Sequence, residues 1–195
     1  MKTLYWTFAA LVLGVTLAVS PTSAQQNVVI CTQPISGGTI NNVSVPPNAT
    51  CTLTNVTVQG NIKVNTNALL QTNECIAQGN IRAEGAALIF IDATSIGGNL
   101  NAVGTVSVKV DSSSIDGNVS VTGADSLIAI ENNQVNGNVD VEKNNTGSGN
   151  TNVIQNNTIG GNLICTDNTP LPVDLVPEGS PNIVAGHKVG QCAGL

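Results

Sequence analysis

The residues of this chain that could do chemistry are few, and the most regular set of them is acidic. Asp92, Asp111 and Glu131 each stand six residues before a Gly-Asn pair. Acids that recur at one position of a repeat would lie about 5 Å apart on successive turns of a repeating fold. Several close carboxylate oxygens form the ligand set that Ca²⁺ prefers, so the series is a candidate calcium site. The other interpretation is a solvated acidic face beside Lys109, and we favour it.

No catalytic motif accompanies these acids. The sequence contains no G-x-S-x-G, P-loop or H-E-x-x-H pattern. His187 has no obvious serine or cysteine partner that would suggest a nucleophile, so we interpret it as a surface histidine. Lys63 and Arg82 stand at equivalent repeat positions, but Asn101 follows at the next one, so we interpret them as part of a mixed surface. We therefore expect no catalytic residue, no metal and no cofactor.

The N-terminal segment resembles a secretory signal. Lys2 precedes an apolar run over residues 4–19, and Thr22-Ser23-Ala24 ends before Gln25 in the pattern of a signal-peptidase site. The alternative is a membrane anchor, but the run falls short of the about 20 residues that a spanning helix needs. We predict a signal peptide over residues 1–24 and a secreted, extracellular or cell-surface domain over residues 25–195.

The mature chain is acidic and nearly free of aromatic rings. Twelve Asp and Glu residues face five basic ones, and Phe90 is the last aromatic side chain after the signal is removed. Nucleic-acid binding needs basic residues against phosphates and usually stacking rings, so we expect no such partner. The basic residues of the mature chain are Lys63, Arg82, Lys109, Lys143 and Lys188.

Cysteines in a secreted chain are mostly paired. Cys31 and Cys51 lie about one repeat apart before the regular section, and Cys165 and Cys192 follow it. We predict the bridges Cys31–Cys51 and Cys165–Cys192, each worth about 3 kcal/mol in the chain-entropy model. Cys75 would then be free. The competing assignment pairs Cys51 with Cys75 and leaves Cys31 free.

A repeat organises the elements that must position these side chains. Gly-Asn pairs recur at steps of nineteen residues, then twenty, then twenty-four. The pairs are Gly60-Asn61, Gly79-Asn80, Gly98-Asn99, Gly117-Asn118, Gly137-Asn138 and Gly161-Asn162. Apolar residues at spacing two surround each pair, as Ile96, Leu100 and Ala102 do in the third repeat. A second run, with Ile89 and Ile91, occupies the rest of the unit, so each unit holds at least two short strands with one buried face.

The Gly-Asn pair itself has a structural explanation. Glycine permits a corner with positive φ. The asparagines would stack in one inward column, where each amide bonds to backbone of the neighbouring turn and satisfies groups that would otherwise be buried unpaired. We therefore expect the column Asn61, Asn80, Asn99, Asn118, Asn138 and Asn162 to be structural rather than ligand-binding.

The repeated pattern Gly-Asn-apolar-x-apolar resembles the coils of right-handed parallel β-helices, over roughly residues 38–190. This is the fold of pectate lyases and of bactofilin polymers. This resemblance implies an all-β, single-stranded right-handed solenoid of about six to eight coils with disulfide-clamped ends. Regular coils would cover about residues 56–165, and a C-terminal cap would cover about 166–195. The resemblance implies little about function, because many activities use this scaffold.

Sequons add one prediction that depends on this register. Asn48, Asn144 and Asn156 lie in expected corners and are candidates for glycosylation. Asn118 also begins a sequon, but its expected place in the inward column predicts that it stays bare.

Three functions fit these features. The first is a secreted, non-enzymatic module with a structural or interaction role, whose partner is unknown and could be a wall or surface polysaccharide or a protein. The second is a carbohydrate-active or carbohydrate-binding protein of pectin-lyase-like descent. The third is an ice-binding protein, which the broken surface columns disfavour. The two longer steps, residues 143–152 and 169–181, are where we expect a partner site.

Overall fold

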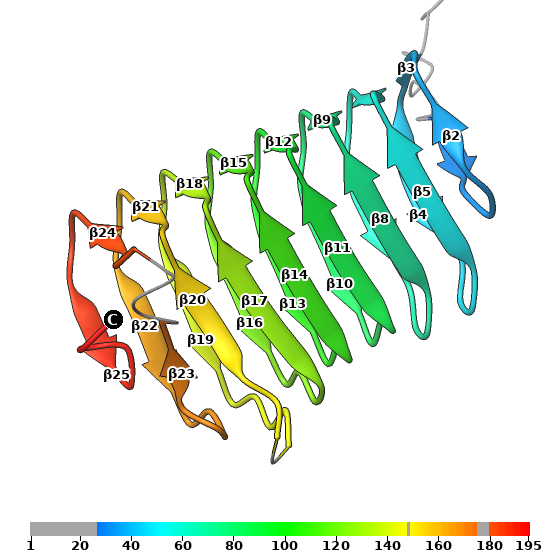
Figure 1. Cartoon of the computed structure of the whole chain (residues 1–195). Coiled ribbons are helices and arrows are strands. Elements are labelled where there is room, and N and C mark those ends of the chain that lie inside the picture. The colour runs from blue at the N-terminus through cyan, green and yellow to red at the C-terminus, as the bar shows by residue number, and fades with distance from the viewer. Residues whose placement is uncertain (1–26, 148, 175–179) are drawn as a thin grey trace, which may run out of the picture.

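In a computed structural model, the chain forms a parallel β-solenoid of about seven turns (Figure 1). The structure describes residues 27–147, 149–174 and 180–195, so the predicted signal peptide lies outside the described residues. Within the described ranges there are 25 short strands and no helix. No described helix is therefore long and apolar enough to cross a membrane.

Each turn contributes one strand to each of three parallel sheets. Sheet A consists of β1 (Val28–Ile30), β4 (Asn42–Val45), β7 (Ile62–Val64), β10 (Ile81–Glu84), β13 (Leu100–Val103), β16 (Val119–Thr122), β19 (Val139–Glu142), β22 (Leu163–Thr166) and β25 (Lys188–Gly190). Sheet B consists of β2 (Ile35–Ser36), β5 (Thr50–Thr54), β8 (Leu69–Asn73), β11 (Leu88–Asp92), β14 (Ser107–Asp111), β17 (Leu127–Glu131), β20 (Asn152–Gln155) and β23 (Pro172–Val173). Sheet C consists of β3 (Thr39–Ile40), β6 (Thr57–Val58), β9 (Ile76–Ala77), β12 (Ser95–Ile96), β15 (Ser114–Ile115), β18 (Gln134–Val135), β21 (Thr158–Ile159) and β24 (Ile183–Val184).

The repeat sets the register between turns. Ile81 pairs with Leu100 and Ile89 with Val108, so equivalent positions of the nineteen-residue unit lie side by side. Within a strand, side chains alternate between the buried core and the outer face, as in Leu88–Asp92, where Ile89 and Ile91 are fully buried. Stacked Ile, Val, Leu and Ala side chains therefore fill the interior, which contains no aromatic ring among the described residues.

Sheet C is a third element that the apolar runs did not separate. Its strands contain only two residues, of which the second is buried in the inner turns, as at Ile96 and Ile115, and half-buried in the end strands β3 and β24. We name the three corners of each turn by the sheets they join: the A–B corner, the B–C corner and the C–A corner. Each Gly-Asn pair lies at the C–A corner.

The prediction that the repeat glycines are needed for a positive φ at this corner is wrong. None of the six repeat glycines has a positive φ, and positive φ angles occur at the other two corners, as at Ala93 and Gly104. A Cβ on Gly117 would lie 2.5 Å from Asn99 Oδ1 and 2.7 Å from the carbonyl oxygen of Gly98. Glycine is required because the neighbouring turn approaches too closely for any side chain.

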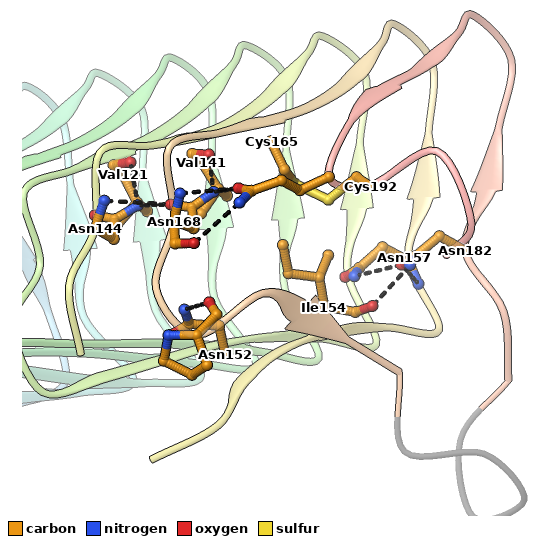
Figure 2. Close-up of a disulfide and its surroundings, with 12 residues drawn as sticks. Val121, Val141, Asn144, Asn152, Ile154, Asn157, Cys165, Asn168, Asn182 and Cys192 are labelled. Carbon is orange, nitrogen blue, oxygen red and sulfur yellow. Dashed lines mark hydrogen bonds between the residues drawn. A yellow bond between two sulfur atoms is a disulfide. The ribbon is translucent and has the colours of Figure 1, made fainter. Parts of the chain in front are cut away.

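Disulfides close both ends of the solenoid, as predicted. Cys31 and Cys51 are bonded with a Cα–Cα distance of 5.4 Å, and Cys165 and Cys192 with one of 5.2 Å (Figure 2). Cys75 is the free cysteine of the described chain, so the competing Cys51–Cys75 assignment is wrong. The first bridge joins the segment after β1 to β5 of sheet B, and the second joins β22 of sheet A to the segment after β25.

Candidate functional site

Asparagine ladders run along the corners of the solenoid, and the expected one lies on its surface. At the C–A corner, Asn80 Oδ1 accepts a hydrogen bond from the backbone N–H of Asn99 at 2.8 Å. The same bond joins each successive pair from Asn42 to Asn162 and ends at the backbone N–H of His187. These side chains are exposed or half-buried, so the prediction that the column faces inward is wrong. We call this column the outer ladder.

Two other ladders are buried, and sequence reasoning missed both. At the B–C corner, Asn133, Asn157 and Asn182 stack inside the last turns, where Asn157 Nδ2 donates to the carbonyl oxygen of Ile130 at 2.7 Å. At the A–B corner, Asn168 Nδ2 likewise donates to the carbonyl oxygen of Val141 at 2.7 Å (Figure 2). Each amide satisfies backbone groups that the corner leaves unpaired in the interior.

The A–B ladder contradicts one glycosylation candidate. Asn144 is 1% exposed, and its Nδ2 donates to Asn168 Oδ1 at 2.8 Å, so it cannot carry a glycan in the folded protein. Asn48 and Asn156 are exposed. Asn118 is exposed as well, and the reason given for its staying bare is therefore wrong.

The sequons yield a direct prediction in any host that glycosylates. We expect Asn48 to be occupied and Asn144 to be empty in the folded, secreted protein, because a glycan at Asn144 would break the A–B ladder. Glycopeptide mass mapping checks both positions in one experiment. Full occupancy of Asn144 in folded protein would contradict the ladder.

The acidic series occupies one edge of the outer face of sheet B. Asp92 and Asp111 are paired in register, and so are Asp111 and Glu131. Each carboxylate already accepts a hydrogen bond from an amide of an adjacent turn, for example from Asn73 Nδ2 to Asp92 Oδ2 at 2.9 Å. No group of three or more His, Cys, Asp or Glu side chains in the described ranges is arranged to hold a metal ion. These amide hydrogen bonds fit the interpretation of the series as a solvated acidic face.

Phe90 lies at the centre of the same face. It points outward between the buried Ile89 and Ile91 and is half-buried. The ammonium group of Lys109, on the next turn, lies 5.2 Å from the ring centroid and 3.8 Å from Asp111 Oδ2. The aromatic ring of Phe90 and the ammonium group of Lys109 therefore form a cation–π contact with each other.

Cys75 lies at the buried position of the B–C corner, which Thr94 holds on the next turn. Its side chain is 3% exposed, and its thiol donates to the carbonyl oxygen of Asn73 at 3.3 Å. Burial keeps a thiol from reacting, because the attacking species is the accessible thiolate. We expect no thiol to react in the native protein and one per chain to react after unfolding without reductant, measured with a chromogenic disulfide reagent. Reaction of the native protein would contradict this placement.

The two longer steps lie partly outside the described residues, and part of the first one is buried. In the first, Thr146 donates to Asn152 Oδ1 at 2.9 Å, and both side chains are buried, so part of this insertion folds inward as packing. Ser148 of this insertion and residues 175–179 of the second lie outside the described residues. The partner site expected in these segments stays a prediction.

A groove does lie on the outer face of sheet A. It has a volume of about 440 Å³ and follows the outer ladder across three successive turns. Its polar lining residues are Asn61, Lys63, Asn80, Arg82, Asn99 and Asn101. Lys63 and Arg82, which we interpreted as part of a mixed surface, therefore line one concave site together with the ladder amides.

Charge changes sign along this outer column of sheet A. Lys63 pairs in register with Arg82 and Arg82 with Asn101, and Ser120 and Asp140 follow on the next two turns. Partial burial raises the pKa of Asp140, and the charge of Glu142 raises it further. In this column, the positively charged side chains are thus Lys63 and Arg82, which lie on the turns that form the groove.

No family model, curated protein or solved structure matches this chain. The resemblance to parallel β-helices is supported by the observed fold alone, which is a parallel β-solenoid.

Proposed function

We propose that the mature chain is a secreted, non-enzymatic β-solenoid that works as a structural or interaction module at the cell surface or in the extracellular matrix or wall. The observation that carries this proposal is the pair of disulfides at the two ends of a laddered solenoid. Disulfides persist in oxidising, extracellular environments. The predicted signal peptide over residues 1–24 supports the same location.

The construction of the solenoid suits a rigid scaffold. Consecutive turns are joined by hydrogen bonds in all three sheets and by amide ladders at the corners. The two disulfides link the terminal turns covalently to neighbouring segments, which holds the ends of the solenoid in place. Such a rod presents fixed outer faces along its length, which favours binding to an extended partner.

The test is to express the full chain in a secreting host and fractionate the culture. We expect a mature N-terminus at Gln25, two disulfides, and recovery from the medium or by elution from wall material. Lysozyme-sized soluble proteins with a similar negative charge, mixed into the same wall preparation, serve as the control for trapping. Retention of the uncleaved chain inside the cell with reduced cysteines would contradict the proposal.

A further inference from the structure

The groove on sheet A gathers positive charge in an acidic protein. Two of the five basic residues expected in the mature chain, Lys63 and Arg82, stand on adjacent turns in register. Their Cα atoms are thus about 5 Å apart. Arg82 donates from Nε to Glu84 Oε1 at 2.9 Å, whereas Lys63 has no ion pair within the described residues. One cation of the groove is therefore available to an anion, and the other is held in place beside it.

The effect on Glu84 shows how these charges act. The hydrogen bond from Arg82 and then its charge lower the pKa of Glu84, and the charge of Lys63 lowers it further. Lys63 therefore contributes to the same local positive potential as Arg82. An anion in the groove would meet the ammonium group of Lys63 and, beside it, the guanidinium N–H groups of Arg82 that do not bond to Glu84.

The outer ladder adds neutral donors to the same wall. Asn80 Nδ2 donates one hydrogen to Asn61 Oδ1 at 3.1 Å, and Asn99 Nδ2 donates one to Asn80 Oδ1 at 3.2 Å. An amide group carries two hydrogens, so each of these nitrogens retains a second donor. These asparagines are exposed, so the second hydrogens suit a ligand rich in acceptor oxygens.

Asn101 supplies a complementary acceptor. Its Oδ1 is shielded from solvent and accepts no hydrogen bond from any described residue. A shielded acceptor without a donor costs free energy, which a donor from a ligand or from a rearranged side chain would recover. A ligand hydroxyl would supply this donor once the amide of Asn101 rotates toward the groove that it lines, so the groove suits a ligand with an anionic group and a neighbouring hydroxyl.

We propose that this groove binds an acidic saccharide, with its anionic group on Lys63 and Arg82, its ring oxygens on the ladder amides and a hydroxyl near Asn101. This inference rests on the proposed function as a non-enzymatic module and names its ligand class. Sugar sites often use ring stacking, but Phe90 lies on sheet B, so recognition here depends on charge and hydrogen bonds. Binding is accordingly sensitive to salt.

Calorimetry of the mature protein with three defined probes tests the proposal. The probes are a short oligosaccharide of hexuronic acid, its carboxyl-reduced neutral counterpart, and a sulfated disaccharide. We expect at least one charged probe to bind and the neutral one not to bind. The two charged probes distinguish a carboxylate from a sulfate as the anionic group.

Two variants place the ligand in the groove. Lys63→Gln with Arg82→Gln should weaken binding at least about tenfold, because both charge-assisted hydrogen bonds are lost. Asn101→Asp should also weaken it, because it adds a negative charge to the wall. Lys143→Gln removes one exposed cation outside the groove and should leave affinity within about twofold. Unchanged thermal unfolding of each variant shows that the fold is intact.

Absence of binding by both charged probes would overturn the inference, and so would equal binding of the neutral probe or an unchanged affinity in the double variant. The proposed function would survive any of these results, because secretion and wall association are measured separately.

Discussion

Replacing Gly117 by alanine is expected to lower the free energy of unfolding by about 3 kcal/mol or more, which is the upper range for overpacking in a rigid interior. The added Cβ would meet Asn99 Oδ1 at 2.5 Å and the backbone oxygen of Gly98 at 2.7 Å. Neither group can withdraw easily, because the first belongs to the outer ladder and the second accepts a hydrogen bond from the N–H of Gly117. Urea denaturation of the purified variant measures the loss.

Gly104→Ala is the matched control for this substitution. Gly104 has a φ of 59°, and nothing lies within 4 Å of the position of an added Cβ. Alanine there should cost only about 1–2 kcal/mol, from the left-handed backbone conformation. Adding Asn99→Ala to Gly117→Ala should restore only part of the stability, since the Gly98 oxygen still obstructs the Cβ. Equal losses for Gly117→Ala and Gly104→Ala would refute the close-approach explanation.

Asn157→Ala is expected to cost about 2–5 kcal/mol, because each unpaired buried polar group costs about 1–3 kcal/mol. Asn157 is 1% exposed, and its Oδ1 accepts from the backbone N–H of Asn133 at 3.0 Å. Its Nδ2 donates to the carbonyl oxygen of Ile130 at 2.7 Å and to Asn182 Oδ1 at 2.8 Å. Alanine would leave the backbone N–H of Asn133 and the carbonyl oxygen of Ile130 without these partners, whereas Asn182 Oδ1 would keep the bond from the backbone N–H of Asn157.

Asn99→Ala provides the comparison, since it removes an equivalent side chain from the outer ladder. Asn99 is exposed, so water replaces the lost bond to the N–H of Asn118, and we expect a cost of about 1 kcal/mol or less. Both variants are measured by the same denaturation experiment. A cost for Asn99→Ala as large as that for Asn157→Ala would mean that the two ladders do not differ in their exposure to water.

The sequence predicts the solenoid because its period is read directly from the chain. Once Gly98-Asn99 and Gly117-Asn118 are placed on adjacent turns, the alternation within strands determines that Ile89 faces inward and Phe90 outward. The cysteines follow from the same register, because Cys31 and Cys51 stand about one turn apart. These inferences need only spacing.

Spacing along the sequence does not predict which side chains face inward at the corners. The alternation of inward and outward side chains breaks at a turn, so the sequence did not reveal that Asn99 faces solvent while Asn133 and Asn157 face the core. A signal for the buried B–C ladder did exist. The position four residues before each glycine of the pair changes along the chain from apolar to polar and never holds a charged residue, as in Val56, Cys75, Thr94, Ser113, Asn133 and Asn157.

The remaining differences need distances between turns. The requirement for glycine at the C–A corner comes from the approach of Asn99 and Gly98 to Gly117, which no local pattern contains. The sequon at Asn144 lies in a longer step, where the register is lost, so its inward position was not apparent. The groove was missed for a similar reason, since Lys63 and Arg82 join the outer ladder only once that ladder is known to face outward.

Prolonged incubation of the purified mature protein with an acidic polysaccharide of known chain length tests directly whether the solenoid binds such a polymer without cleaving it. Binding is followed by co-sedimentation and cleavage by the size distribution and the new reducing ends of the polymer. We expect the wild-type protein to bind the polymer without changing its size distribution, and we expect Lys63→Gln with Arg82→Gln to weaken this binding at least about tenfold. Shortening of the polymer by the wild-type protein but not by this variant would contradict this expectation.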